Sequence, residues 1–271
     1  MQLFIRQYVR EHGTNSSHIT DGLIRHLHEL NTNNIRSMNL VPGRYRQENV
    51  TAGDYSAPDA HEVPRLMKEF IDFLNHPHTI HALTPLIRSI IAHFYLITIH
   101  PFSDGNGRTS RALEAFILYS SGYNVRGFYS LANYHYRHRD EYIEQLNNAR
   151  FKDNGNLTNF VKYCMRAFLH ELQEVQQSIL EYIKLITFKD FVLEATKVGE
   201  INMRQMNVMQ FLLDGGKLYS EEYKNKKAPL IEHLYSNVTS KTAQRDLKYL
   251  LSEELIIERD KKLLPNISLM D

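Results

Sequence analysis

The order of apolar and polar residues along the chain predicts a mainly α-helical protein. Apolar side chains recur every three or four residues, the period of an amphipathic helix, over residues 23–30, 63–74, 85–99, 136–150 and 157–188. Residues 32–60 are polar and contain Gly and Pro, so we expect irregular structure there with one short hairpin. Residues 75–84 are expected to form a connector, and residues 122–134 a turn-rich crossover.

The pattern changes near residue 198, where a second unit is expected to begin. Helical periodicity covers residues 203–213, 230–235 and 238–251, and residues 255–259 and 263–264 resemble two strands around a charged turn. Three helices and a hairpin resemble a winged helix-turn-helix domain, and Ser-x-Thr-Ala-x-Arg-Asp-Leu at residues 240–247 resembles its recognition helix. We therefore divide the chain into residues 1–190 and a small α+β domain at residues 198–271.

One short run carries most of the candidate chemistry. Residues 100–111 read His-Pro-Phe-Ser-Asp-Gly-Asn-Gly-Arg-Thr-Ser-Arg. Proline disfavours helical geometry in the residue before it, so His100 is expected just past the end of the helix over residues 85–99. A second apolar-periodic stretch, reaching to about residue 121, places the Gly-Asn-Gly turn at the N-terminus of another helix.

These positions suit a site that holds a polyphosphate, a divalent cation and a proton acceptor. Unpaired backbone N–H groups and the helix dipole make the helix N-terminus an anion site, and glycines let the backbone approach the anion. Arg108 and Arg111 are three residues apart and reach the same side of the first turn. Asp104 beside a phosphate requires a cation between them, usually Mg²⁺, and His100 is then the natural general base. A turn with a helix cap explains any one of these residues, but it does not explain the ordered set.

The run at residues 100–111 matches H-P-F-x-D/E-G-N-G-R-x-x-R, the signature of the Fic family, at every fixed position, and the chain resembles that family. Weaker agreement at residues 42–55, 62–67 and 139–146 extends the resemblance over roughly residues 23–168. The resemblance implies a Fic-type helical bundle with a short β-hairpin flap. It also implies transfer of AMP from ATP to a Ser, Thr or Tyr hydroxyl of a target protein, with release of pyrophosphate.

The resemblance further implies roles for the first half of the signature and for the flap. His100 would deprotonate the attacking hydroxyl of the target, and Asp104 would hold Mg²⁺ between the α- and β-phosphates of ATP. Phe102 would be buried and would anchor the loop. The flap, residues 47–55, would hold the target chain by strand addition.

The second half of the signature would bind the phosphates of ATP. By resemblance, Gly105, Asn106 and Gly107 would form the anion hole that receives the charge developing on the α-phosphate. Arg108 and Arg111 would bind the β- and γ-phosphates.

The chain departs from the family pattern in two places. Many relatives carry two adjacent tyrosines on the nucleotide side, where this chain has Tyr142 and Ile143, the candidate contacts of the adenine. Many relatives also carry an inhibitory helix with S/T-x-x-x-E-G/N, whose glutamate pairs with the second arginine. Residues 17–22 have Asp in place of that Glu, and residues 196–201 have Ile in place of Gly or Asn. The alternatives are a turn with a helix cap for residues 17–22 and a linker for residues 196–201, so the sequence leaves open whether the chain is inhibited in cis.

The composition of the chain limits its number of domains, its partners and its compartment. The chain has 271 residues, 42% of them hydrophobic and 23% charged, which suits one large domain and one small one. A net charge of +1 indicates no bulk attraction to nucleic acid or membrane. The single cysteine, Cys164, cannot form an internal disulfide and argues against a four-ligand zinc site, and the scattered histidines show no metal-binding spacing. No apolar run reaches the length of a membrane span and no signal-peptide pattern is present, so we expect a cytoplasmic protein.

The sequence is compatible with three functions. The first is an AMP-transferring enzyme. A variant of it, the third, is an enzyme of the same kind that transfers another phosphate-linked group. The second is a DNA-binding transcriptional regulator with a nucleotide-sensing core, which would contact DNA through Lys241 and Arg245, with Lys261 and Lys262 on the wing. Those basic residues are equally typical of a solvated face or a protein-interaction module. A second copy of the chain is a further candidate partner.

Overall fold

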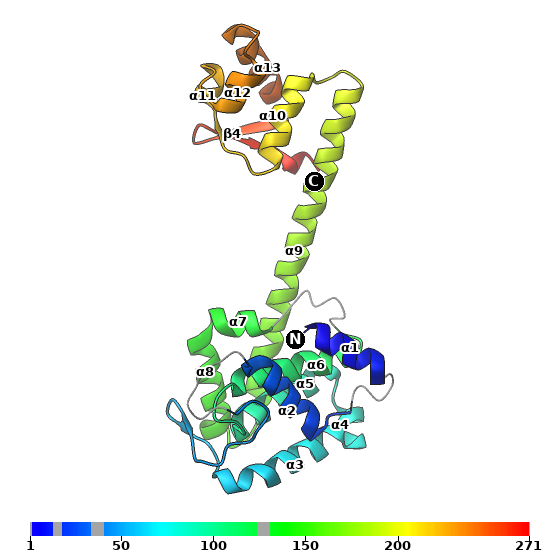
Figure 1. Ribbon diagram of the computed structural model, residues 1–271, viewed down its shortest axis with the longest axis vertical. Helices are drawn as coiled ribbons and strands as arrows, with labels where there is room; N and C mark the ends of the chain where they lie inside the picture. The colour runs from blue at the N-terminus through cyan, green and yellow to red at the C-terminus, as the bar shows by residue number, and fades with distance from the viewer. Residues whose placement is uncertain (1, 13–17, 34–40, 124–130, 271) are drawn as a thin grey trace. The chain divides into compact units, whose positions relative to one another are not determined.

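The protein divides into two compact units, Met1–Val175 and Gln176–Asp271. A computed structural model describes residues 2–12, 18–33, 41–123 and 131–270. The first unit is helical with a two-stranded hairpin, and the second combines helices with a small three-stranded sheet (Figure 1). The predicted fold class, mainly helical with a hairpin and a small C-terminal α+β part, is confirmed.

Two long helices form the centre of the first unit. α5 and α6 pack against each other, α1 and α2 pack against α6, and α3 packs against α5 (Figure 1). The helices are α1 (Gln2–His12), α2 (Asp21–Thr32), α3 (Val63–Asn75), α4 (Pro77–Ala82), α5 (Pro85–Ile99), α6 (Asn106–Ser120), α7 (Leu131–Arg137) and α8 (Arg139–Asn147), with a 3₁₀ turn at Ala60–Glu62 and a π-helical turn at Asn148–Lys152. Buried side chains from α2, α3, α5 and α6 share one core, which includes Leu27, Phe70, Leu96 and Phe116.

The short hairpin predicted between residues 32 and 60 is present. β1 (Thr51–Ala52) pairs antiparallel with β2 (Tyr55–Ser56), with Ala52 opposite Tyr55. Gly53 takes a φ of 61° in the connecting turn, a conformation that glycine adopts without steric cost. Residues 34–40, also expected to be irregular, lie outside the described residues.

α9 (Thr158–Lys197) contributes to the cores of both units. Phe160 and the buried free thiol of Cys164 lie in the first unit, where they pack with residues of α5 and α8. Phe188, Val192 and Ala195 lie in the core of the second unit. The described part of the chain contains no helix that is both long and apolar enough to span a membrane.

The second unit builds a small sheet beside its helices. Its further elements are α10 (Met203–Leu213), β3 (Leu218–Tyr219), α11 (Ser220–Lys224), α12 (Pro229–Leu234), α13 (Ser240–Ser252), β4 (Ile256–Arg259), β5 (Lys262–Pro265) and a 3₁₀ turn at Ile267–Met270. The strand order is β3-β5-β4, with both pairs antiparallel. α10 begins with a capping box, in which Asn202 and Gln205 bond each other's backbone N–H.

Several elements differ from the sequence prediction. The expected connector at residues 75–84 contains α4, because Pro77 fits its first position and the His76 side chain accepts a bond from the backbone of His78. The expected helix over residues 136–150 is divided at His138, whose φ and ψ of −115° and 44° are not helical. The prediction also ended α9 too early, at residue 188, and it missed α11 and β3, which are only five and two residues long.

Candidate active site

The loop between α5 and α6 carries the candidate base at one end and the glycine turn at the other. His100 takes a left-handed conformation, with φ 53° and ψ 56°, directly after α5 ends. Pro101 accounts for the helix end, since it disfavours α geometry at the preceding residue. Gly105 has a φ of 79°, and an added Cβ there would lie 2.7 Å from Thr32 Cγ2. Only glycine fits this approach of the loop to α2.

A reciprocal pair of hydrogen bonds closes the loop. The Phe102 N–H donates to Asn106 Oδ1 at 2.9 Å, and Asn106 Nδ2 donates to Phe102 O at 2.8 Å. Both side chains are buried, so Phe102 lies where the resemblance implies. The Asn106 side chain therefore holds the shape of the loop. What this residue offers a ligand is its backbone N–H, which lacks an intrahelical acceptor in the first turn of α6.

His28, which no sequence pattern singled out, holds the loop from α2. Its ring is fully buried and lies flat on Phe102, with ring centroids 3.7 Å apart. Its Nδ1 accepts from the Gly43 N–H at 2.9 Å, so its Nε2 carries the proton and donates to Asp104 O at 3.0 Å. Burial lowers the pKa of His28, in keeping with a neutral ring. The only sequence signal is a histidine among apolar positions, which many cores contain.

The surroundings of His100 favour a neutral imidazole with its proton on Nδ1. That atom lies 3.2 Å from Ile97 O, which accepts and cannot donate. Nε2 therefore keeps its lone pair. Burial lowers the pKa of His100, and the charges of Arg150 and Arg46 lower it further, against the raising effect of the Ile97 carbonyl. The ring is thus ready to accept a proton at neutral pH.

The charged residues of the run gather at the N-terminal end of α6. The Asp104 side chain is 49% exposed, and its Oδ1 lies 3.5 Å from Arg108 Nη2. Arg111 lies over Gly107, where an added Cβ would be 3.4 Å from Arg111 Nη1. The helix N-terminus adds partial positive charge to the same region. An accessible carboxylate beside a site for phosphate oxygens provides the ligands that Mg²⁺ prefers, so these residues fit that ion.

The hairpin is attached to the end of α5, next to the loop. Tyr55 Oη donates to Thr98 O at 2.7 Å. The Arg150 guanidinium lies 3.7 Å from the centroid of the Tyr55 ring, a cation–π contact. Arg150 also donates to Thr98 Oγ1 and to Ile97 O, each at 3.1 Å. These contacts fix the hairpin against the residues that precede His100.

Arg46 joins the loop to a cleft beside the hairpin. Its Nε donates to His100 O at 2.8 Å, and its backbone N–H donates to Pro101 O at 2.9 Å. The cleft has a volume of about 1000 Å³, and its walls include Arg25, Arg44, Arg46, Gln47, His61 and Ser103. Three arginines therefore line a cleft that reaches the loop at Ser103.

The two candidate adenine contacts lie in different environments on α8. Tyr142 is only 9% exposed, and its Oη lies 2.7 Å from Nε2 of the buried His93. Ile143 is 37% exposed. Tyr142 is thus part of the core between α5 and α8, whereas Ile143 is at the surface. A role for either residue in holding the adenine stays a prediction.

Helix ends occupy the two segments that loosely match the inhibitory motif. In residues 17–22, Thr20 Oγ1 caps α2 by accepting from the Leu23 N–H at 3.1 Å, and Ser17 lies outside the described residues. In residues 196–201, Thr196 Oγ1 donates to Val192 O at 2.8 Å in the last turn of α9. Inhibition in cis stays an open alternative for both segments, beside the capped turn and the linker.

The basic residues considered for DNA contact lie in the second unit. Lys241 and Arg245 are exposed on α13, and Lys261 is exposed in the turn between β4 and β5. The neighbouring Asp246 is buried, accepts from Tyr235 Oη at 3.1 Å and pairs with Arg204 at 3.3 Å. Asp246 therefore packs inward while the basic side chains remain at the surface.

Comparisons with known proteins agree on one family. The family model described as "Fic/DOC family" matches residues 18–118. The "Protein adenylyltransferase Fic" of Nematostella vectensis is 32% identical over 129 residues, which are 47% of this chain and 27% of that protein. The "Protein adenylyltransferase fic-1" of Caenorhabditis elegans is 32% identical over 137 residues, or 51% of this chain and 24% of that protein. The chain thus spans about a quarter of the length of these curated relatives.

Solved structures of Fic proteins share the fold. A Fic family protein from Desulfovibrio desulfuricans G20 superposes with a TM-score of 0.51 at 19% identity, over 97% of this chain and 74% of that one. Fic-1 of C. elegans (residues 134–508) superposes with a TM-score of 0.51 at 28% identity, over 65% of this chain and 48% of that one.

Proposed function

Residues 18–118 form a Fic/DOC family domain, and on that premise we propose that the chain is a protein adenylyltransferase. It moves AMP from ATP to a Ser, Thr or Tyr hydroxyl of a target protein and releases pyrophosphate. The observation that carries the proposal is the complete run at residues 100–111, in which the base, the carboxylate, the glycine turn and both arginines are present. The curated relatives with this activity in their names support it.

His100 acts as the general base in this reaction. Its Nε2 takes the proton from the target hydroxyl while the hydroxyl oxygen attacks the α-phosphorus of ATP. A new P–O bond forms to the target, the bond from the α-phosphorus to the bridging oxygen breaks, and its electron pair leaves with pyrophosphate. The contact between Nδ1 and Ile97 O supports this role because it leaves Nε2 unprotonated.

The N-terminal end of α6 holds the phosphates. The backbone N–H groups of Gly105, Asn106 and Gly107 stabilise the charge that develops on the α-phosphate oxygens. Arg108 and Arg111 bind the β- and γ-phosphates as bidentate or paired donors. Mg²⁺, held by the Asp104 carboxylate and phosphate oxygens, would neutralise charge on the leaving pyrophosphate.

The hairpin and the cleft receive the target protein. In this proposal residues 47–55 act as the flap and add a strand of the target to the free edge of the hairpin. In the cleft, Arg25 pairs with Asp21 and the buried Arg46 donates to backbone carbonyls. The exposed Arg44 therefore favours an acidic residue of the target beside the modified hydroxyl. Transfer of a phosphate-linked group other than AMP remains the alternative within the same site.

A labelling experiment tests the proposal. The purified chain is incubated with Mg²⁺ and ATP labelled on the α-phosphate, alone and with cell lysate, beside His100→Ala as the matched inactive variant. We expect labelled protein that disappears in the variant, whereas ATP labelled on the γ-phosphate leaves no label on the purified chain incubated alone. Equal α-label on both proteins would contradict the role of His100, and label from the γ-phosphate would indicate phosphoryl transfer instead.

The alternative function, a DNA-binding regulator, rests on the second unit. Its exposed basic residues on α13 and its small sheet support a winged helix-turn-helix assignment for residues 198–271. Salt-dependent binding to duplex DNA that weakens in Lys241→Ala and Arg245→Ala would support the DNA-binding function. The division of the chain into two domains at residues 190–198 stays a prediction. A homodimer also stays a prediction, and light scattering would check it.

A further inference from the structure

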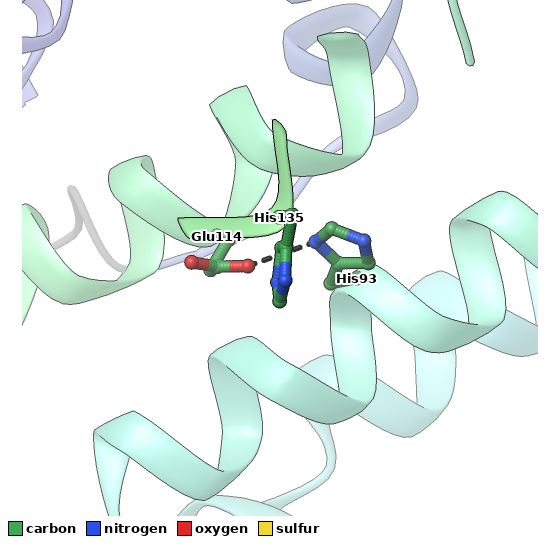
Figure 2. Close-up of side chains that lie close together, drawn as sticks. All are labelled: His93, Glu114 and His135. Atoms are coloured by element: carbon green, nitrogen blue, oxygen red, sulfur yellow. Dashed lines mark hydrogen bonds and ion pairs between the residues drawn. The ribbon is translucent and has the colours of Figure 1, made fainter. Parts of the chain in front are cut away.

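Three side chains that the proposed reaction does not use meet in the core of the first unit. His93 extends from α5, Glu114 from α6 and His135 from α7 (Figure 2). One nitrogen or oxygen ligand atom from each lies within 4.8 Å of the others. Their exposed fractions are 1%, 5% and 3%, so the group is shielded from water.

His135 lacks the hydrogen bonds that a buried imidazole needs. Neither of its ring nitrogens has a hydrogen-bond partner among the residues that the structure describes. The ring is held in place by stacking, 4.4 Å from the Tyr142 centroid and 5.8 Å from that of Tyr163. A buried polar group without a partner is costly, and its presence in a native core indicates a missing ligand or water. Burial also lowers the pKa of His135 to about 2, so the ring is neutral and its nitrogen lone pair is available.

We propose that His93, Glu114 and His135 bind one divalent transition-metal ion of the Zn²⁺ class. Two imidazoles and one carboxylate are a donor set that Zn²⁺ accepts, with the fourth tetrahedral position left for water. The hard ions Mg²⁺ and Ca²⁺ prefer oxygen ligands and do not fit two nitrogens. The site is separate from the Asp104 carboxylate, and it does not depend on the proposed AMP transfer.

The hydrogen bonds around His93 allow metal binding with a simple proton balance. Its Nδ1 lies 2.8 Å from Glu114 Oε2, and its Nε2 lies 2.7 Å from Tyr142 Oη. When Nδ1 binds the ion, the ring proton moves from Nδ1 to Nε2, which then donates to Tyr142 Oη, a hydroxyl that can accept as well as donate. The ring loses no proton in this exchange, and the carboxylate binds the ion directly.

A second group of metal-ligating side chains, found among the described residues of the first unit, is already neutralised. His170, Glu171 and Glu174 also lie close together, on α9. Arg137 pairs with both glutamates and lies 3.0 Å from Glu174 Oε2. A guanidinium thus occupies the position that a cation would take, which makes His170 a suitable control.

Metal binding at the buried group would join side chains of three different helices through one ion. The ion would fix α7 onto α5 and α6, whose adjoining ends carry the loop at residues 100–105. The sequence did not indicate this site because its three residues are separated by 21 positions in each step and belong to different helices.

The test uses the full chain, stripped with a chelator and titrated with ZnCl₂ in a calorimeter. We expect the titration to give one ion per chain. The melting temperature should rise with free Zn²⁺ concentration. Glu114→Gln and His135→Phe should lose stoichiometric binding, Tyr142→Phe should weaken it about 10–100-fold, and His170→Ala should bind like the unmodified chain.

Crystallography keeps the test decisive if a core variant fails to fold. Crystals of the unmodified chain grown with Zn²⁺ should show an anomalous difference peak at the zinc edge between the three side chains. Co²⁺ should give a visible spectrum of tetrahedral intensity. The proposal is wrong if the stripped chain binds no ion, if the peak lies elsewhere, or if folded Glu114→Gln and His135→Phe retain the binding.

Discussion

The ring of His28 lies parallel to the ring of Phe102, with an interplanar angle of 5° and a centroid separation of 3.7 Å. The same imidazole bonds Gly43 on one side and Asp104 on the other. A residue of α2 thus fixes both the buried anchor of the loop and the backbone of the proposed Mg²⁺ ligand. The position of the Asp104 carboxylate consequently depends on a side chain that does not contact the phosphates in our proposal.

Replacing His28 by Phe should separate stacking from hydrogen bonding. The flat contact with Phe102 is retained, but Asp104 O and the Gly43 N–H lose their partner, at a cost of about 1–3 kcal/mol for each group left buried. We expect the free energy of unfolding to fall by that order and AMP transfer to fall further than the folded fraction. Chemical denaturation and the labelling assay measure the two effects. His18→Ala, at an exposed histidine, should change neither.

Gly105→Ala should destabilise the loop through a specific clash. A Cβ at this position meets Thr32 Cγ2 at 2.7 Å and also requires a φ of 79°. We expect a loss of about 2–4 kcal/mol, more than the about 1–2 kcal/mol expected from the left-handed conformation alone. Gly155→Ala isolates that second effect, because Gly155 has a φ of 80° and nothing within 4 Å of an added Cβ.

The clash at Gly105 can be relieved by a second substitution. Thr32→Ser removes Cγ2 and keeps the hydroxyl that donates to His28 O at 2.7 Å. The double variant should therefore be more stable than Gly105→Ala alone, as judged from denaturation midpoints. Equal losses for Gly105→Ala and Gly155→Ala would show that the clash does not matter.

The pH dependence of transfer should reflect the lowered pKa of His100. Burial and the nearby arginines disfavour the imidazolium, so the neutral base persists below its ordinary pKa of 6.5. The free energy of unfolding should also fall in acid. The unfolded histidine takes up a proton near pH 6.5 and the folded ring does not, so acid favours unfolding. We expect kcat/KM to be flat through pH 7 and to fall only below pH 6.5. ATP affinity measured over the same range is the control, and an acid limb above pH 6.5 would contradict the assignment.

Tyr55→Phe should affect the target more than ATP. The substitution removes the bond from Tyr55 Oη to Thr98 O and keeps the ring beneath Arg150. One lost hydrogen bond is worth about 1 kcal/mol, so we expect the KM for the protein target to rise about five-fold while ATP affinity is unchanged. Tyr136→Phe, at a side chain that is 84% exposed, is the matched control. An equal effect of both substitutions on the KM would contradict the role of the hairpin.

Local chemistry decided which parts of the fold and of the site could be predicted. Proline and glycine act on their immediate neighbours, so the ends of α5 and α6 and the position of His100 between them followed from the sequence. The contacts that support the loop could not be found this way. His28 is 76 residues from Asp104, and Arg46 is 54 residues from His100. Such pairs depend on how α2 and the hairpin pack, and no spacing in one sequence encodes that packing.

The reciprocal bonds between Asn106 and Phe102 also bear on how the protein ages. Asn106 is followed by Gly107, and Asn-Gly in a mobile chain is prone to lose its side-chain amide when the next backbone nitrogen attacks it. Here both atoms of the Asn106 amide are engaged and buried, and the following residue is held in the first turn of α6. Folding therefore protects the Asn106-Gly107 peptide from deamidation. Molecules that deamidate while unfolded would refold with a carboxylate facing Phe102 O in place of the Asn106 amide.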